Sequence, residues 1–152
     1  MTSVIGLDPG VTGGVALLPE GCGAEVYPMP GGPLELYTLL RGFVAKHGVR
    51  GTGFVVWSEK AFLMPSNGAK ANFAVGRSAG LIQMACAALG LPLYEVAPNT
   101  WRPAMVGRGK DKEASRLLAI QHYPHLADRL KFKNSHGLAE ALLIAEWGKT
   151  HG

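Results

Sequence analysis

The sequence has few cysteines and no long apolar run. Its two cysteines, Cys22 in a Gly-rich turn and Cys86 in an apolar segment, belong to no CxxC or Cys/His cluster. A disulfide framework and a zinc site of that kind are therefore excluded. No stretch approaches the ~20 consecutive apolar residues that span a bilayer. The opening MTSVIGLDPG has the pattern of a strand and not of a signal peptide. We expect one domain, residues 1–152, with free thiols, no membrane association and no transit peptide in this chain.

Charged residues are also scarce, at 17% of the chain against 47% hydrophobic residues, and they are unevenly distributed. Residues 101–133 contain eight basic and three acidic side chains, whereas the rest of the chain contains seven and eight. A local basic excess suits a polyanion, because each contact to a phosphate releases counterions. A solvated basic face is the alternative, and the pattern alone does not separate the two. The basic residues of this stretch are Arg102, Arg108, Lys110, Lys112, Arg116, Arg129, Lys131 and Lys133.

Hydrophobic periodicity predicts an α/β order along the chain. Short apolar runs separated by Gly-containing turns predict three consecutive strands within residues 3–28. Leu36, Leu40 and Phe43 fall on one helical stripe, with Gly48 as a stop. Further on we expect a fourth strand at 52–59, a long apolar helix at 71–90, a fifth strand at 91–98, and helices at 99–106, 111–122 and 135–149, with a Pro-containing link at Pro124. This order predicts a mixed five-stranded sheet with helices on both faces.

Two carboxylates stand at the ends of predicted strands. Asp8 ends the apolar run VIGLD, and Glu59 ends FVVWSE. A carboxylate at the edge of an apolar sheet is costly unless a cation or a hydrogen-bond donor receives it. Asp8 alone would also fit as a turn residue of DPG. Glu59 has no such explanation.

A second acidic motif lies near the C-terminus, in NSHGLAEALLIAEW. His136 and Glu140 are four residues apart and project from the same face of the predicted helix. A histidine at a helix start is often merely solvated, and a glutamate in a first turn suits the helix dipole, so the pair alone is not decisive. If the first and fourth strands are neighbours, the pair can converge with Asp8 and Glu59. Oxygen ligands with one imidazole suit Mg²⁺ or Mn²⁺.

Three motifs in order, IGLDPGVTGG, WSEKAF and HGLAEALLIAEW, resemble those of the RuvC-type Holliday-junction resolvases, which have a ribonuclease-H-like fold. SHGLAEALLIAEWGK, with NTW and KDKEASRLLAIQHYP before it, is most similar to the plant chloroplast branch, the monokaryotic-chloroplast resolvase. The resemblance implies a homodimer that makes paired symmetric nicks in a four-way DNA junction by metal-dependent phosphodiester hydrolysis. It also implies Mg²⁺ as cofactor, as a pair of ions in each site, with Mn²⁺ able to substitute.

The resemblance extends to individual residues. Asp8, Glu59 and Glu140 fall on acidic metal positions of that family, and His136 falls on the fourth, where many relatives carry Asp. Lys112 matches a lysine near the scissile phosphate, so the implied catalytic set is these five residues. Phe62 matches an aromatic that stacks on an unpaired base. For the remaining DNA contacts we expect Lys70, Arg77, Arg102, Lys110, Arg116, Lys131 and Lys133.

Ordinary structural roles compete with some of these assignments. Lys110 and Lys112 fit as solvated residues before a helix, and Phe62 fits as a core aromatic. The apolar helix at 71–90 has more hydrophobic surface than one sheet face can cover, so we expect the dimer interface there. For a plant or algal protein we expect the chloroplast nucleoid, and otherwise the cytoplasm.

Other functions fit the sequence less well. IGLDPGVTGG also resembles the first phosphate loop of actin-like ATPases and sugar kinases, but those need a second domain, and the chain contains no GxxxxGK[ST] motif. We expect no small-molecule substrate. Two alternatives stay open: a nuclease of the same fold that processes ribosomal RNA precursors, and a non-catalytic junction-binding module. The acidic set argues against the second.

Overall fold

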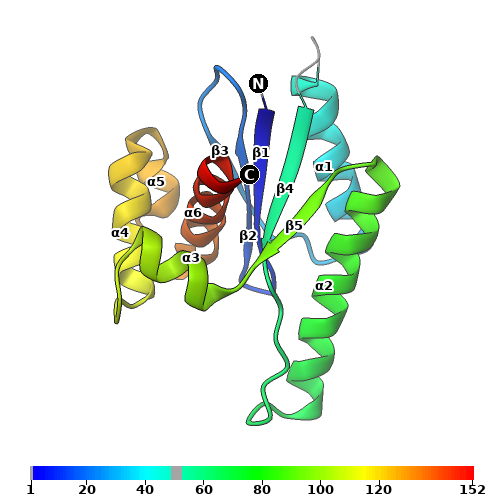
Figure 1. Cartoon of the computed structure of the whole chain (residues 1–152), viewed down its shortest axis with the longest axis vertical. Helices are drawn as coiled ribbons and strands as arrows, with labels where there is room; N and C mark the ends of the chain where they lie inside the picture. Colours follow the sequence, from blue (N-terminus) through cyan, green and yellow to red (C-terminus); the bar gives the residue numbers. More distant parts are fainter. Residues whose placement is uncertain (1, 49–52) are drawn as a thin grey trace.

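Five strands form one mixed sheet in the order β3-β2-β1-β4-β5 (Figure 1). The computed structural model describes residues 2–48 and 53–152. The hairpin strands β1, β2 and β3 pair antiparallel, whereas β4 runs parallel to β1, and β5 parallel to β4. The strands are β1 (Thr2–Asp8), β2 (Gly14–Leu18), β3 (Glu25–Pro28), β4 (Gly53–Glu59) and β5 (Leu93–Val96). The predicted mixed five-stranded sheet is confirmed.

Helices cover both faces of the sheet, as expected (Figure 1). On one face lie α1 (Pro33–His47) and α2 (Ala69–Leu89). On the other face α6 (His136–His151) lies against the strands, with α3 (Pro98–Met105), α4 (Lys112–His122) and α5 (Ala127–Leu130) around it. Short 3-10 turns occupy Pro124–Leu126 and Lys133–Ser135. The segment after Pro124, expected as a link, is thus a chain of short helical turns.

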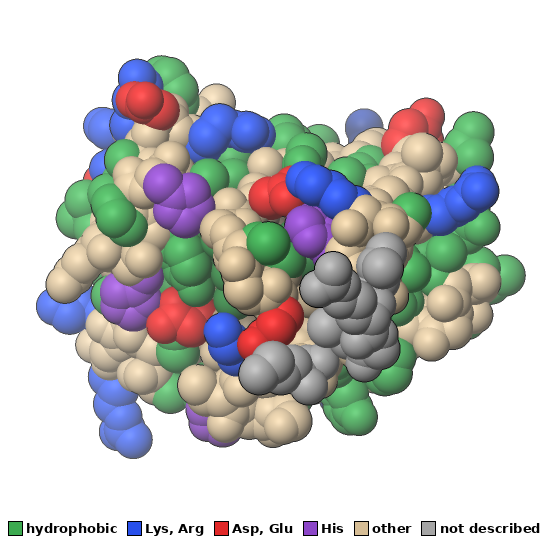
Figure 2. All heavy atoms as spheres, turned by 90° about the horizontal axis from the view of Figure 1, so that it is seen from above, with side chains coloured by type: hydrophobic (Ala, Val, Ile, Leu, Met, Phe, Trp, Pro, Cys, Tyr) green, Lys and Arg blue, Asp and Glu red, His purple; other side chains and the backbone are tan. Residues whose placement is uncertain are grey.

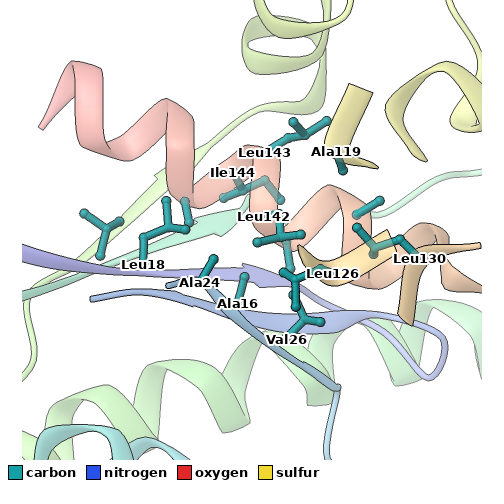
Figure 3. Close-up of a cluster of buried hydrophobic side chains, with 14 of the residues drawn as sticks. Ala16, Leu18, Ala24, Val26, Ala119, Leu126, Leu130, Leu142, Leu143 and Ile144 are labelled. Carbon is teal, nitrogen blue, oxygen red and sulfur yellow. The ribbon is translucent and has the colours of Figure 1, made fainter. Parts of the chain in front are cut away.

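Each face of the sheet has its own apolar core, because successive strand residues point to opposite sides. Ile5, Leu7, Val15 and Leu17 pack with α1 and α2, whose Leu36, Leu40, Phe43 and Ile82 are buried. Ala16, Leu18 and Val26 pack on the α6 side, where Leu142, Leu143 and Ile144 meet Leu126 and Leu130 (Figure 3). The two cores hold the sheet rigidly between the helix layers.

Helix boundaries follow local chemistry and differ from the expected ones by a few residues. Pro33 begins α1, where a fixed φ and a missing N–H cost nothing. Gly90 caps α2 in the left-handed conformation at φ 66°. That helix begins at Ala69, two residues before the predicted start, and β5 is shorter than the predicted 91–98. Thr52, expected in the fourth strand, lies outside the described residues.

Two glycines let α6 lie directly on the sheet. A Cβ on Gly6 of β1 would collide with the backbone of Ala141 and Ala145, and a Cβ on Gly14 of β2 would collide with the backbone of Gly137. The helix therefore approaches β1 and β2 backbone to backbone, closer than any side chain at these positions would allow. Glu140, which precedes Ala141, is thereby brought to the end of β1.

Candidate metal centre

Asp8, Glu59 and Glu140 converge at the carboxyl ends of the two central strands. In the parallel register of β1 and β4, Leu7 pairs with Ser58, so the last residues of the two strands, Asp8 and Glu59, lie side by side. Glu140 reaches them from the first turns of α6. One carboxylate oxygen from each residue lies within 4.8 Å of the others. The predicted convergence of these three residues therefore occurs.

Burial and the charges of neighbouring carboxylates oppose the ionisation of Asp8 and Glu140. The pKa of Asp8 is raised to about 8, first by burial and then by the charges of Glu140 and Glu59. Burial likewise raises the pKa of Glu140, which is 3% exposed. A folded protein that gathers three carboxylates in a poorly solvated place needs positive charge there.

Part of that positive charge comes from Arg102 of α3. Its Nη2 donates to Oε1 of Glu140 at 2.9 Å and lies 3.6 Å from Oε2 of Glu59. The neighbouring Trp101 is fully buried and donates its Nε1–H to the same Oε2 of Glu59 at 2.9 Å. The two successive α3 residues thus fix the orientation of Glu59. Lys112 and Arg102 both lower the Asp8 pKa, but by less than burial raises it.

His136 and Lys112 lie beside the carboxylates in a cavity of about 200 Å³. Asp8, Thr12, Asn134, Gly137 and Glu140 complete its lining. Nδ1 of His136 lies 3.0 Å from the carbonyl oxygen of Lys112, which can only accept a hydrogen bond, so Nδ1 carries the proton. In the neutral ring this leaves Nε2 with a free lone pair. His136 is not within the 4.8 Å grouping of the three carboxylates, so its metal-ligand role stays a prediction.

Phe62 lies on the other side of Glu59 and is 46% exposed. It is not the core aromatic of the alternative interpretation. It lines a second, mainly apolar cavity of about 270 Å³ together with Glu59, Lys60, Met64 and Val75. Lys60 Nζ lies 5.7 Å from the ring centroid. An accessible aromatic beside a carboxylate cluster can stack on a planar group.

The basic residues predicted as DNA contacts do not form one group. Lys70 and Arg77 are exposed on α2, Lys110 is exposed before α4, and Lys131 and Lys133 are exposed near α5. Arg116 is only 9% exposed, because its guanidinium binds Glu113 and donates to the carbonyl of Leu130 at 2.9 Å. In this structure Arg116 joins α4 to α5 instead of facing solvent. Arg102, expected as a phosphate contact, binds the carboxylates.

The end of the molecule at the top of Figure 1 lies away from the carboxylate cluster. There, acidic, basic and histidine side chains are intermixed (Figure 2). A polyanion would meet no field of a single sign on that face.

The sequence interpretation overlooked Trp101, Thr12 and Asn134. Thr12 and Asn134 gave no signal, since both are common loop residues. Trp101 did, because a tryptophan that is buried usually finds a partner for its N–H. Its partner, Glu59, lies 42 positions earlier in the chain.

The donor set fits a divalent cation. Three carboxylates supply the hard oxygen ligands that Mg²⁺, Mn²⁺ and Ca²⁺ prefer. Such an ion would also offset the burial and the repulsion that raise the Asp8 pKa. Asp8, Glu59 and Glu140 are the residues able to hold it, and His136 Nε2 is the nearest candidate nitrogen.

Comparison with solved structures identifies the architecture. The structure of Thermus thermophilus RuvC is similar over 95% of this chain and 91% of that chain, with 26% sequence identity and a TM-score of 0.52. The same protein in complex with a Holliday junction substrate is similar over the same shares, with 24% identity and a TM-score of 0.55. The fold is that of RuvC. No protein-family model and no curated protein sequence matches the chain.

The RuvC fold places the acidic cluster at the end of the sheet where β1 and β4 terminate.

In the described part of the chain, no helix is both long and apolar enough to cross a membrane.

Proposed function

We propose that this protein is a structure-specific nuclease that resolves four-way DNA junctions by metal-dependent phosphodiester hydrolysis. The observation that carries the proposal is the convergence of Asp8, Glu59 and Glu140 at the ends of β1 and β4 in a RuvC fold. A solved RuvC of the same fold is bound to a Holliday junction substrate. A non-catalytic binding module would have no reason to gather three carboxylates, two of them buried, against their own repulsion.

Each site residue has a definable role in this reaction. Asp8, Glu59 and Glu140 hold the cofactor, which we propose to be Mg²⁺ as a pair of ions, with Mn²⁺ able to substitute. Bound there, such ions would supply the activation of a water and the neutralisation of the leaving oxygen. Lys112, exposed at the mouth of the cavity, supplies positive charge for the scissile phosphate. Phe62 stacks on a base that is unpaired at the centre of the junction.

Paired symmetric nicks require two sites at a fixed separation, which a twofold homodimer supplies. The outward side of α2 supports an interface there, because it exposes Phe73 and Met84, at 72% and 68%, with Gly76 and Gly80 between them. A Cβ on either glycine would meet nothing within 4 Å among the described residues. We propose that a second copy packs on this side of α2.

The chloroplast branch and the cellular location rest on the sequence motifs alone, since both solved structures described above are of the RuvC of Thermus thermophilus. If the source is a plant or an alga, we propose the chloroplast nucleoid, and otherwise the cytoplasm. Fractionation of source cells followed by immunodetection tests this, and a plant protein found outside the plastid would contradict it.

A three-substrate assay tests the proposed function. The protein is incubated with a labelled mobile four-way junction, the matching linear duplex and a structured RNA, each with Mg²⁺ and with EDTA. We expect cleavage of the junction only, in opposed strands, and only with Mg²⁺. Preferential cleavage of the RNA would favour the ribosomal RNA nuclease. Junction binding without cleavage in Mg²⁺ or Mn²⁺ would favour a binding module.

Asp8→Asn sharpens this assay, because it removes a metal ligand but no phosphate contact. We expect junction cleavage to fall by several orders of magnitude while junction affinity changes little. Gel-shift titration and single-turnover cleavage measure the two quantities. An Asp8→Asn protein that cuts at the parent rate would show that the acidic cluster is not the active site.

A further inference from the structure

The cation that already sits in the acidic cluster is the side chain of Arg102. Its Nη2 approaches Glu140 at 2.9 Å and Glu59 at 3.6 Å, and its side chain is 27% exposed. Glu140 is almost fully buried, so this ion pair is poorly screened by solvent. A metal that binds Glu59 and Glu140 would use the carboxylate oxygens that Arg102 now contacts. The metal and the guanidinium therefore compete for the same two carboxylates.

The remainder of the Arg102 side chain is held less well than its Nη2. Its Nε–H is buried and has no hydrogen-bond partner among the residues that the structure describes. The guanidinium carbon lies 5.2 Å from the centroid of the Trp101 ring, and both ion pairs of Arg102 seen among the described residues are made by Nη2. A buried donor without a partner costs free energy, so this position of Arg102 is favoured only while the carboxylates lack another cation.

A second environment for Arg102 adjoins the first. Arg102 also lines an open groove of about 320 Å³, together with Asn99, Gly107, Gly109 and Lys110. Lys110 is exposed, and none of the described residues that line the groove is acidic. Two cations and an amide on one groove suit an anion such as a phosphate group. Arg102 therefore stands between a carboxylate site and an anion site.

We propose that Arg102 exchanges between these two environments. In the metal-free protein it is the counterion of Glu59 and Glu140. A divalent metal that binds the carboxylates displaces it toward the Lys110 groove, where it binds a backbone phosphate of the DNA. The proposal rests on the proposed function, since it takes the polyanion to be a nucleic acid. The binding of metal and the binding of DNA are then thermodynamically coupled. Bound metal releases Arg102 to contact a phosphate, and a bound phosphate keeps Arg102 away from the carboxylates.

Metal affinity in the absence of DNA tests the first step. Ca²⁺ is titrated calorimetrically into metal-free wild type, Arg102→Gln, Arg102→Lys and Arg41→Gln at a pH above about 8, to which the Asp8 pKa is raised. Arg41→Gln removes the same charge from exposed α1 on the opposite face of the sheet. We expect Arg102→Gln to bind Ca²⁺ about tenfold more tightly than wild type, since no charge-assisted bond must be broken. Arg102→Lys should fall between them, and Arg41→Gln should match wild type.

Junction affinity tests the second step. Fluorescence anisotropy gives the affinity for a labelled junction with and without Ca²⁺, and the gain on adding Ca²⁺ is compared between variants. We expect this gain to be about tenfold smaller in Arg102→Gln than in wild type or Arg41→Gln. Lys110→Gln should weaken junction binding in Ca²⁺ and leave the DNA-free Ca²⁺ affinity unchanged.

Each outcome decides a separate point. Equal or weaker Ca²⁺ binding by Arg102→Gln overturns the exchange. Suppose instead that Arg102→Gln binds Ca²⁺ more tightly but gains as much junction affinity on adding Ca²⁺ as wild type does. The phosphate-binding step is then overturned. If Arg102→Gln does not fold, as judged by circular dichroism, Arg102→Lys decides, and equality with wild type then overturns the exchange. The DNA-free titration does not involve cleavage. A wild type that fails to cut junctions would therefore refute the proposed function, whereas the Ca²⁺ affinities of the Arg102 variants would still decide whether the metal displaces Arg102.

Discussion

Asp8 is the residue at which burial and charge conflict most strongly. Its folded pKa of about 8 lies far above the ordinary 3.8. Between these two pH values the folded, metal-free protein keeps a proton that the unfolded chain has released. The free energy of unfolding of the metal-free protein therefore falls as pH rises through this window, and the loss is complete above about pH 8.

This pH dependence is testable by urea unfolding in EDTA at pH values across that window. We expect wild type to lose stability toward the alkaline end, and Asp8→Asn to lose distinctly less, because its amide never ionises. Asp128→Asn is the matched control, since that side chain is 95% exposed. Saturating Ca²⁺ should restore stability at alkaline pH in wild type. Identical pH profiles for wild type and Asp8→Asn would contradict the burial of this carboxyl group.

His136 can be tested through the choice of metal. Its Nδ1 faces the Lys112 carbonyl, so the neutral ring offers Nε2 to a metal. Imidazole nitrogen is softer than carboxylate oxygen, so the site should favour Mn²⁺ over Mg²⁺ more than an all-carboxylate site does. We expect His136→Asp to remain active and shift toward Mg²⁺, and His136→Ala to lose most activity at limiting metal and regain part at high Mn²⁺. Cleavage rates over both metal titrations measure this.

A His136→Ala protein that matches the parent in both metals would leave His136 as a solvated first-turn histidine. The hydrogen bond to Lys112 would then serve only to position α4 beside α6.

At the scale of elements, the site depends on how closely α6 lies on β1. Gly6→Ala would place a methyl group against the backbone of Ala141 and Ala145, and neither strand nor helix can yield locally. We expect a loss of about 1–3 kcal/mol or more in the free energy of unfolding, as for other overpacked cores. Because α6 carries Glu140, the metal affinity of the folded variant should fall as well.

Gly42→Ala is the control for that change. Gly42 is exposed in the middle of α1, and a Cβ there meets nothing within 4 Å among the described residues. We expect the free energy of unfolding of this variant to rise by about 0.5–1 kcal/mol, because glycine is unfavourable inside helices. Denaturant unfolding and Ca²⁺ calorimetry give both quantities for each variant. A Gly6→Ala protein as stable as wild type would show that the helix need not approach the strand so closely.

At the scale of the whole molecule, the proposed dimer depends on the outward side of α2, which exposes Phe73 and Met84. Met84→Glu puts a charge on that surface, so we expect a monomer at micromolar concentration where wild type is a dimer, and loss of paired nicking. Leu117→Glu, at an exposed apolar position on α4, is the control and should remain dimeric. Light scattering measures the mass. A wild type that is monomeric and makes both nicks would contradict the dimer.

Much of the fold could be predicted because its signals are local. The alternation of apolar residues, Pro33 and Gly90 all act within a few residues of the boundaries they set. The segment after Pro124 was harder, because turns of three or four residues carry no periodicity. Asp8 and Glu59 could be identified as special because each ends a strand of apolar residues, where a charge is out of place.

The sequence by itself determined the order of strands and helices, the strand-end carboxylates and the His136/Glu140 pair, because periodicity and spacing are properties of neighbouring residues. Only the tertiary structure decided which groups meet. The β1–β4 register sets Asp8 beside Glu59, and the Gly6 contact sets the depth of α6. The partners of long side chains depend on that packing, so Arg102 turns to the carboxylates and Arg116 to Glu113 and the Leu130 carbonyl. An arginine reaches any acceptor within its length, and its charge alone does not say which one the fold will bring near.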